Sequence, residues 1–272
     1  MRAISFRLPT LALAAAVLWS GPVAAWERDG HRIIALIAAP YLTPAAKTQV
    51  QELLGGDPVA TMMSAAGWAD EIVANRPETK SWHYAPVPVD QPAYDPARDC
   101  PDGNCVVAQT ERAYLTLADK TQPKAARADA LKFLIHLVGD IHQPLNCGDN
   151  GTNRGNDIKA TVDGKDTTLY ALWETAIVPV MGSDPTALAT RFRKNITLQL
   201  RKSWFTGSVR DWCWESAQVA KTGAYDDLRG AATDNGRIII SGDYPYEKAN
   251  IASTQMKKAG VRLSGLINQA LK

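Results

Sequence analysis

The order of apolar, polar and helix-capping residues predicts a mainly helical protein. The clearest helix begins at Thr43 and Pro44, an N-cap residue followed by proline at the first helical position, and ends at Gly55-Gly56. The next expected helix, at residues 58–75, carries Trp68 and Asp70 in an otherwise apolar-rich stretch. Further helices are expected at 106–119, 123–142, 171–180, 185–203, 208–222 and 246–271.

Two stretches differ from this helical pattern. Residues 157–169 alternate around Asp163-Gly164, a dipeptide typical of a hairpin turn. Residues 84–104 are rich in proline and aspartate, so we expect a loop there. Because no repeat or linker divides the chain, the sequence predicts a single all-α domain with a minor β-hairpin.

Residues 1–25 have the features of a secretory signal peptide. Two arginines precede a short apolar stretch at residues 11–18, and Val23-Ala24-Ala25 is a small-residue cleavage site. The apolar stretch is too short to span a bilayer well. We therefore expect a mature domain of residues 26–272 that starts at Trp26, has no membrane anchor and is secreted or periplasmic.

The overall charge gives no reason to expect nucleic-acid binding. The chain has 30 basic and 28 acidic residues. The predicted signal contains two of the arginines and no acid, so the charges of the mature chain balance. Any affinity for a polyanion must therefore come from a local site.

The four cysteines are Cys100, Cys105, Cys147 and Cys213, which allow three pairings. Export to an oxidising compartment favours disulfides. We favour Cys100–Cys105, which closes a turn-like segment, and Cys147–Cys213 as a long-range link. Zinc–thiolate ligation is the alternative, but the spacing is not that of a zinc knuckle.

The strongest chemical signal is the pair His136 and Asp140. They are four residues apart, so they share one face of a helix and can hold a divalent cation together. A helix-surface ion pair is the alternative interpretation. His142 is six residues from His136, on roughly the opposite side of the helix, and precedes Pro144, so we expect a structural role for it.

Three other residues are weaker candidates on local grounds. Asp70 lies in an apolar-rich helix, where a carboxylate needs a metal or an arginine as partner. His83 lies between two aromatic residues, where ordinary packing is the main alternative. His31 follows Trp26 by five residues, and a free α-amino group at Trp26 can lose its proton and bind a metal together with its own carbonyl oxygen.

In combination these residues resemble the S1/P1 nuclease family. That family comprises zinc-dependent nucleases that prefer single strands and are related in structure to bacterial zinc phospholipase C. The resemblance covers most of the mature chain. It rests on Trp26, His31, Trp68-Ala69-Asp70, Trp82-His83-Tyr84, residues 136–145, Arg154-Gly155-Asn156-Asp157, Leu172-Trp173-Glu174 and residues 259–263.

The resemblance implies a helical domain with a three-zinc cluster. It implies that one zinc is held by Asp70, His83, His136 and Asp140. The second is held by Trp26, through its amino nitrogen and carbonyl oxygen, together with His31 and Asp140. Asp140 then bridges the two ions, and Asp70 and Asp140 have catalytic roles in holding the metals and orienting the attacking water.

The third zinc site of the family is not matched. Asn146 and Tyr170 stand where the family has histidines, and Glu174 stands where it has an aspartate. One carboxylate and one amide make a weak zinc site. We expect about two zinc ions per chain, with the third position absent or occupied by Mg²⁺, Mn²⁺ or Ca²⁺ at Asn146 and Glu174.

Four residues are candidates for contact with substrate. Tyr84 stands where the family stacks a nucleobase, and core packing is the alternative. Arg76 is the nearest substitute for a family arginine that this chain lacks, although an ordinary surface position is the alternative. Asn156 and Asp157 are expected either to contact the nucleotide or to form the turn before the hairpin.

We therefore expect an exported, metal-dependent nuclease. It would hydrolyse phosphodiester bonds of single-stranded DNA and RNA, and 3′-nucleotides as further substrates, with a metal-activated water. The alternatives are a phospholipase C-like phosphoesterase and a non-catalytic zinc-binding relative. Nothing in the sequence indicates an obligate protein partner.

Overall fold

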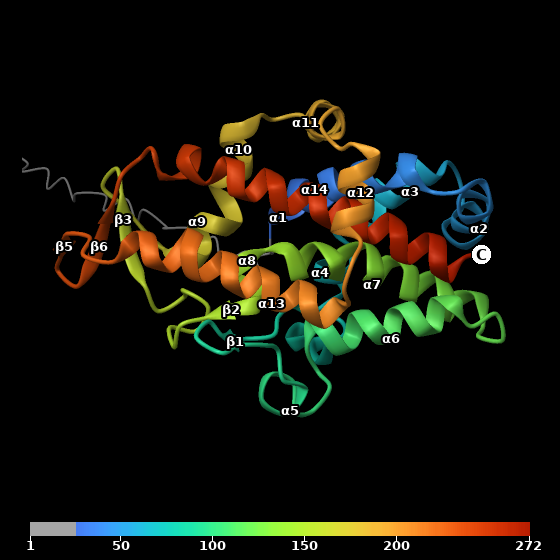
Figure 1. Ribbon diagram of the computed structural model, residues 1–272, viewed down its shortest axis with the longest axis horizontal. Helices are drawn as coiled ribbons and strands as arrows, with labels where there is room; N and C mark the ends of the chain where they lie inside the picture. Colours follow the sequence, from blue (N-terminus) through green and yellow to red (C-terminus); the bar gives the residue numbers. More distant parts are fainter. Residues whose placement is uncertain (1–25) are drawn as a thin grey trace, which may run out of the picture.

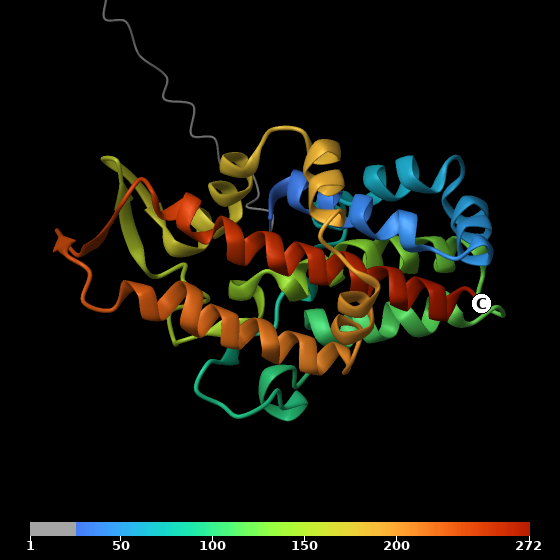
Figure 2. The same ribbon diagram turned by 45° about the horizontal axis from the view of Figure 1, so that its top comes forward.

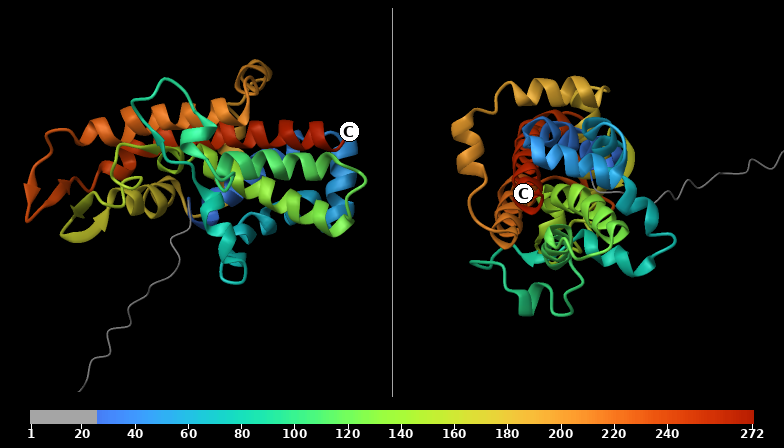
Figure 3. Two further views of the ribbon diagram at one scale, coloured as in Figure 1. Left: turned by 90° about the horizontal axis from the view of Figure 1, so that it is seen from below. Right: turned by 90° about the vertical axis from the view of Figure 1, so that its right-hand side faces the viewer.

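The computed structural model describes residues 26–272 and is mainly helical, with a small sheet at one end (Figure 1). Helix α7 (Lys124–His142) runs through the centre. The long helices packed around it are α1 (Glu27–Ala38), α6 (Val106–Ala118), α13 (Val209–Ala220) and α14 (Tyr244–Ala270). Turning the molecule shows the same grouping (Figure 2), and the end-on view shows α1, α6, α7 and α14 clustered together (Figure 3). The predicted all-α fold class is confirmed.

The sequence of α7 explains its central position. From Ala130 to His142 every side chain except that of Lys132 is buried. A helix that is apolar on all sides is stable only when it is covered on all sides. The polar residues among them, which include His136 and Asp140, therefore lie inside the protein and need partners there.

The remaining helices are short and cover this central group. Helix α2 has the bounds predicted from its capping residues. These remaining helices are η1 (Ala39–Tyr41), α2 (Pro44–Leu54), α3 (Pro58–Ala65), α4 (Trp68–Ile72), η2 (Pro77–His83), α5 (Pro96–Asp99), α8 (Pro144–Cys147), α9 (Leu169–Thr175), α10 (Ile177–Met181), α11 (Pro185–Arg193), α12 (Leu198–Trp204), η3 (Lys221–Tyr225) and η4 (Asp226–Leu228).

Three predicted helices are interrupted. The range 58–75 is two helices separated at Ala66-Gly67, and 171–180 is two helices that meet at Ala176. The range 185–203 is also two helices, because the hydroxyl of Thr197 accepts the N–H of Leu200 and so caps a new helix. Helix α1 was not predicted.

The predicted hairpin is present, but it belongs to a larger sheet. Strands β3 (Lys159–Val162) and β4 (Lys165–Thr168) are antiparallel, and β6 (Arg237–Ile240) pairs with β3 in parallel. Strand β5 (Thr233–Asp234) completes the order β4-β3-β6-β5. The β3–β6 pairing joins segments that are distant in sequence, which local alternation cannot indicate.

The predicted loop at 84–104 contains short regular elements. Helix α5 lies within it, and strand β1 (Val87–Pro88) pairs in parallel with β2 (Gly148–Asp149). Asp95 caps α5 by accepting the N–H of Ala97. The expectation of a wholly irregular loop was therefore wrong, although these elements are only two to four residues long.

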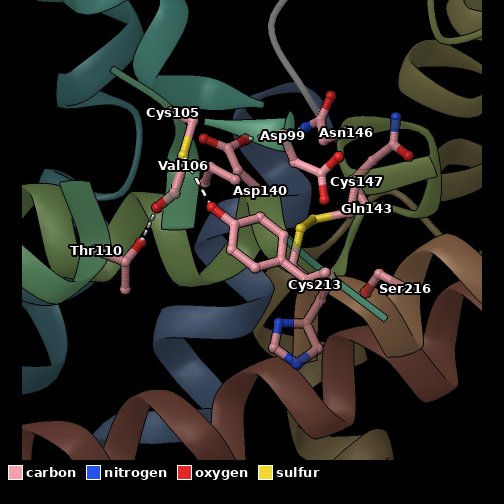
Figure 4. The surroundings of a disulfide bond; sticks show 12 residues. Asp99, Cys105, Val106, Thr110, Asp140, Gln143, Asn146, Cys147, Cys213 and Ser216 are labelled. Carbon is pink, nitrogen blue, oxygen red and sulfur yellow. Dashed lines mark hydrogen bonds between the residues drawn. A yellow bond between two sulfur atoms is a disulfide. The ribbon is translucent and has the colours of Figure 1, made fainter. Parts of the chain in front are cut away.

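Both expected disulfides are present. Cys100 is bonded to Cys105, and Cys147 is bonded to Cys213. Figure 4 shows the second bond beside Gln143, Asn146 and Ser216. This bond joins α8, which follows the C-terminal end of α7, to α13. The two disulfides fit a protein that folds in an oxidising compartment.

The predicted signal peptide lies outside the described residues. Within residues 26–272, the helices are too short or too polar to cross a bilayer.

Candidate metal centre

Five side chains from four segments of the chain meet at one point. His31 comes from α1, Asp70 from α4, His83 from the end of η2, and His136 and Asp140 from α7. Two overlapping groups, His31/Asp70/His136 and His83/His136/Asp140, have potential ligand atoms within 4.8 Å of one another. The structure thus brings together the five side chains that the sequence proposed for the paired site.

The carboxylate of Asp140 faces histidines on both sides. Its Oδ2 lies 2.9 Å from Nδ1 of His83 and 3.2 Å from Nε2 of His136. Its Oδ1 lies 3.6 Å from Nε2 of His31. On the first side, Oδ1 of Asp70 lies 3.6 Å from Nδ1 of His83 and 3.5 Å from Nε2 of His136. This is the arrangement that a bridging carboxylate requires.

A backbone carbonyl sets the tautomer of His136. Its Nδ1–H donates to the carbonyl oxygen of Ala66 at 2.6 Å, so Nε2 is the nitrogen that faces the two aspartates. Ala66 lies in the break between α3 and α4. Histidines that bind a metal usually donate their other N–H to a carbonyl or carboxylate. The helix break missed by the sequence analysis therefore provides a supporting contact for a ligand.

His31 is placed by close packing against α7. Its ring stacks on that of His136 with centroids 3.8 Å apart and planes 11° apart. A Cβ atom at Gly139 would lie 2.6 Å from Nδ1 of His31. Glycine therefore leaves room for the imidazole in this position, where a larger residue would force it to move. Gly139 was missed in the sequence analysis, although it stands between the two ligands of α7.

The pKa values of these side chains depend on one another. Burial raises the pKa of Asp140, but His136 and His83 outweigh it and hold the pKa well below its usual range. Burial lowers the pKa of His136, but Asp140 and Asp70 outweigh it and raise the pKa well above its usual range. Asp70 has a lowered pKa, because His136 overcomes the effect of burial. The carboxylates are therefore charged and need cations beside them.

The donor set fits zinc. Imidazole nitrogens and carboxylate oxygens are the ligands that zinc takes in proteins. Asp140 and His136 are wholly buried, and Nε2 of His136 makes no hydrogen bond within the described residues. In that part of the chain no lysine or arginine forms an ion pair with Asp70 or Asp140, so their neighbouring cations are only histidines.

The N-terminal residue of the described chain lies beside a further buried acid. Burial raises the pKa of Glu174 well above its usual range, the hydrogen bond from Gln143 opposes that rise, and Asp140 adds to it. The backbone N–H of Trp26 also lowers the Glu174 pKa, and the Trp26 residue is itself buried. Trp26 is thus next to the acidic centre, where its proposed role as a ligand requires it.

The comparisons with known proteins agree with this geometry. The sequence model of the S1/P1 nuclease family matches residues 26–272. The chain belongs to the S1/P1 nuclease family. It is 27% identical over 93% of its length to Endonuclease 2 of Arabidopsis thaliana, with 93% of that protein covered. It is 25% identical over 89% to Nuclease S1 of Aspergillus oryzae and 26% identical over 90% to Nuclease P1 of Penicillium citrinum, with 91% and 97% of those proteins covered.

Membership of the S1/P1 nuclease family confirms the enzyme class predicted from the sequence. The chain is a metal-dependent hydrolase of phosphodiester bonds. The described residues include candidate groups for that metal.

In this S1/P1 family member the residues that the sequence resemblance assigned to a third metal position form a hydrogen-bonded network. The hydroxyl of Tyr170 donates to Oδ1 of Asn146 at 3.0 Å, and Nδ2 of Asn146 donates to Oδ1 of Asp140 at 3.4 Å. Glu174, one helical turn after Tyr170, accepts from the amide of Gln143. The amide and the hydroxyl at the two positions where the resemblance implies histidines are therefore hydrogen-bonded to other residues. The supporting role of Gln143 was not predicted.

The candidate substrate residues lie in different surroundings. The guanidinium of Arg76 is 5.5 Å from the ring centroid of Phe133, and it pairs with Glu78 at 3.4 Å. These contacts fit the alternative of an ordinary surface arginine. Tyr84 adjoins His83, and the guanidinium of Arg154 lies over its ring. The Tyr84 ring therefore packs against Arg154, and its contact with a nucleobase stays a prediction.

The other two candidates form the turn before the hairpin. The amide nitrogen of Asn156 donates to the carbonyl oxygen of Asn153 at 2.8 Å, and Asp157 donates its backbone N–H to Thr152. The side chain of Asp157 is exposed. These contacts favour the turn interpretation, and a contact with nucleotide stays a prediction.

His142 faces away from the metal centre, as its spacing predicts. Its Nδ1–H donates to the carbonyl of Val138, and Nε2 accepts from Arg262 at 2.8 Å. Burial and the charge of Arg262 lower the pKa of His142 to about 3, so the ring is neutral. Arg262 belongs to residues 259–263 of α14, one of the stretches on which the family resemblance rests, and this contact joins α14 to α7.

We predict that Gly139→Ala reduces both zinc content and stability. An added Cβ would collide with His31 at 2.6 Å and approach Ile34 at 3.2 Å. Overpacking of this kind costs about 1–3 kcal/mol, although alanine within a helix should otherwise gain about 0.5–1 kcal/mol. Urea unfolding and zinc per chain test the prediction.

Gly67→Ala is the matched control. A Cβ at Gly67 meets its nearest neighbours at 3.6 Å, an ordinary contact distance. It should leave the zinc content unchanged. Equal zinc and equal stability in both variants would show that His31 does not depend on close packing against α7.

Proposed function

We propose that residues 26–272 form a secreted or periplasmic nuclease that holds two zinc ions and cleaves single-stranded DNA and RNA. The observation that carries this proposal is the buried carboxylate of Asp140, whose two oxygens face different histidines. Family membership supports nucleic acid as the substrate. The names Nuclease S1 and Nuclease P1 of two relatives agree with it.

The proposed ligands are the six that the sequence suggested. Asp70, His83, His136 and Asp140 would hold the first zinc. The amino nitrogen and carbonyl oxygen of Trp26, with His31 and Asp140, would hold the second. The carbonyl of Trp26 already accepts the N–H of Gly30 at 3.0 Å, but a carbonyl oxygen has a second lone pair for a metal.

Zinc ions held there would supply a water of lowered pKa, able to attack phosphorus at neutral pH. The residues of the chain fix where that attack takes place. Asp140 is wholly buried and sets the separation of the two ligand groups. The side chain of Asp70 is 20% exposed and that of His83 is 12% exposed, so these two lie where solvent reaches the centre. Asp70 can therefore accept a hydrogen bond from the attacking water and orient it.

The third position, in this proposal, holds no zinc. The polar atoms of Asn146 bond to Tyr170 and Asp140, and Glu174 bonds to Gln143. Binding a third zinc would require these hydrogen bonds to break, with an amide and a phenol as poor replacement ligands. A harder, more hydrated ion at Asn146 and Glu174 is the remaining possibility for this position.

Metal analysis and hydrolysis assays test the proposal. Protein processed at Ala25 should contain about two zinc ions per chain and cleave single-stranded DNA and RNA. A chelator should abolish cleavage and lower the unfolding temperature, because a ligand at 100 times its dissociation constant stabilises a protein by about 2.7 kcal/mol. Hydrolysis of phosphatidylcholine alone, or bound zinc with no hydrolysis of any phosphate ester, would contradict the proposal.

A further inference from the structure

The side chain of Arg154 is clamped between two tyrosines. Its Cζ lies 3.8 Å from the ring centroid of Tyr84 and 5.2 Å from that of Tyr170. Both distances are within the range of a cation–π contact. Tyr84 directly follows η2 and Tyr170 is the second residue of α9, so two separate segments hold the guanidinium.

This clamp is connected to the metal centre on both sides. Tyr84 directly follows the ligand His83. Tyr170 donates its hydroxyl hydrogen to Asn146, and Asn146 donates to Oδ1 of Asp140. The positive charge of Arg154 also opposes the rise in the pKa of Tyr170 that burial causes. The guanidinium is therefore linked through Tyr170 and Asn146 to Asp140, on the side of the unmatched third position.

Arg154 forms no ion pair within residues 26–272. Among the described residues no carboxylate lies within ion-pair distance of its guanidinium, whereas buried Arg262 pairs with Glu215. Stacking on an aromatic ring uses the face of a guanidinium and leaves N–H groups at its edge free to donate. Arg154 is half-buried, so a ligand can reach that edge. A planar cation with free donors suits two oxygens of a phosphate.

The backbone at Arg154 has a conformation that favours glycine. Its φ is 58°, and that of the preceding Asn153 is 51°. A side chain in this left-handed region is disfavoured, and such strain is typical of functional sites. One oxygen of Asp149 holds the segment in place by accepting the N–H groups of Gly151, Thr152 and Arg154 at 3.0–3.1 Å. The loop is thus built to hold an arginine at a position where glycine would be less strained.

We propose that Arg154 binds the phosphate group of the substrate and supplies the positive charge that a third metal ion would otherwise provide. This inference rests on the proposed nuclease function. The N–H groups of Arg154 would donate to the phosphate oxygens whose negative charge increases during cleavage. Tyr84 and Tyr170 position the guanidinium, and the hydrogen bonds of Asn146 fix Tyr170 in turn.

Arg154→Gly tests this inference, because glycine relieves the strained backbone while removing the charge. The variant should keep its zinc and have an equal or higher unfolding temperature. Its kcat/KM on a single-stranded oligonucleotide should fall about 10²- to 10³-fold, the usual effect of losing a transition-state hydrogen-bond donor. Calorimetry with inorganic phosphate on the zinc-loaded protein should show at least about tenfold weaker binding.

Two further variants test whether the effect is specific to the guanidinium of Arg154. Arg154→Lys keeps the charge but not the planar donor edge, so it should recover part of the lost activity. Arg210→Ala removes an exposed arginine that pairs with Glu111 and should leave kcat/KM within about threefold. Unchanged kcat/KM and phosphate affinity in Arg154→Gly would overturn the inference, as would loss of zinc from that variant.

The phosphate measurement separates this inference from the proposed function. If the unmodified protein cleaves no nucleic acid but Arg154→Gly still weakens phosphate binding, the proposed function fails and the phosphate site stands. If the unmodified protein is an active nuclease and Arg154→Gly matches it in both measurements, the inference about Arg154 fails alone.

Discussion

Asp140→Asn is expected to release both zinc ions and to abolish nuclease activity. Asparagine keeps the shape of the side chain but loses the charge and one metal-binding oxygen. Asp140 is the residue whose two oxygens face His31 on one side and His83 and His136 on the other. Since enzymes accelerate their reactions by at least about 10⁶-fold, loss of both metals should reduce kcat/KM by more than about 10⁴-fold. Zinc per chain and the rate on single-stranded DNA are the measurements.

Asp129→Asn provides the matched control. Asp129 is on the same helix, but its side chain is 45% exposed and pairs with Lys132 at 3.2 Å. Exposed pairs of this kind contribute about 0–1 kcal/mol, so zinc and activity should be unchanged. If Asp140→Asn kept one zinc while losing the other, Asp140 would be a ligand of one site and would not bridge the two.

The central helix and the ligands on it could be predicted because their signals are local. The apolar run before His136 indicates a buried helix, and the four-residue spacing to Asp140 places both on one face. The capping residues of α2 gave its bounds directly. Such features depend only on neighbours in the chain, and the resemblance to the family then connected them to more distant ligands.

The features that could not be predicted from the sequence depend on contacts between distant segments. The carbonyl of Ala66 becomes a partner of His136 only because α3 ends there, and β6 becomes a strand only by pairing with β3. From the sequence, Arg154 is expected only to be part of a turn, yet its side chain lies against Tyr84 and Tyr170. No periodicity contains this information, since it arises from packing after the chain has folded.

A short N-terminal extension is the second change with a large expected effect. In protein that begins at Trp26 the α-amino group can lose its proton and bind a metal, because its pKa is near 8. Two added residues, Ala24-Ala25, convert that nitrogen to an amide, which is a poor ligand. Trp26 is buried and its backbone N–H lowers the pKa of Glu174, so the extension changes the surroundings of the acidic centre.

We therefore expect the extended protein to contain about one zinc per chain instead of two, with kcat/KM lower by at least about 10²- to 10³-fold. Both forms should be refolded side by side with the same zinc concentration. An equal extension at the other end, two alanines after Lys272, is the control, because Lys272 is exposed and on a different part of the chain. The ligand His31 stays in place in all three proteins, so the loss should be confined to the site that it shares with Trp26. Equal zinc and equal activity in the N-terminally extended protein would show that the amino group of Trp26 is not a ligand, and that removal of residues 1–25 is not needed to complete the centre.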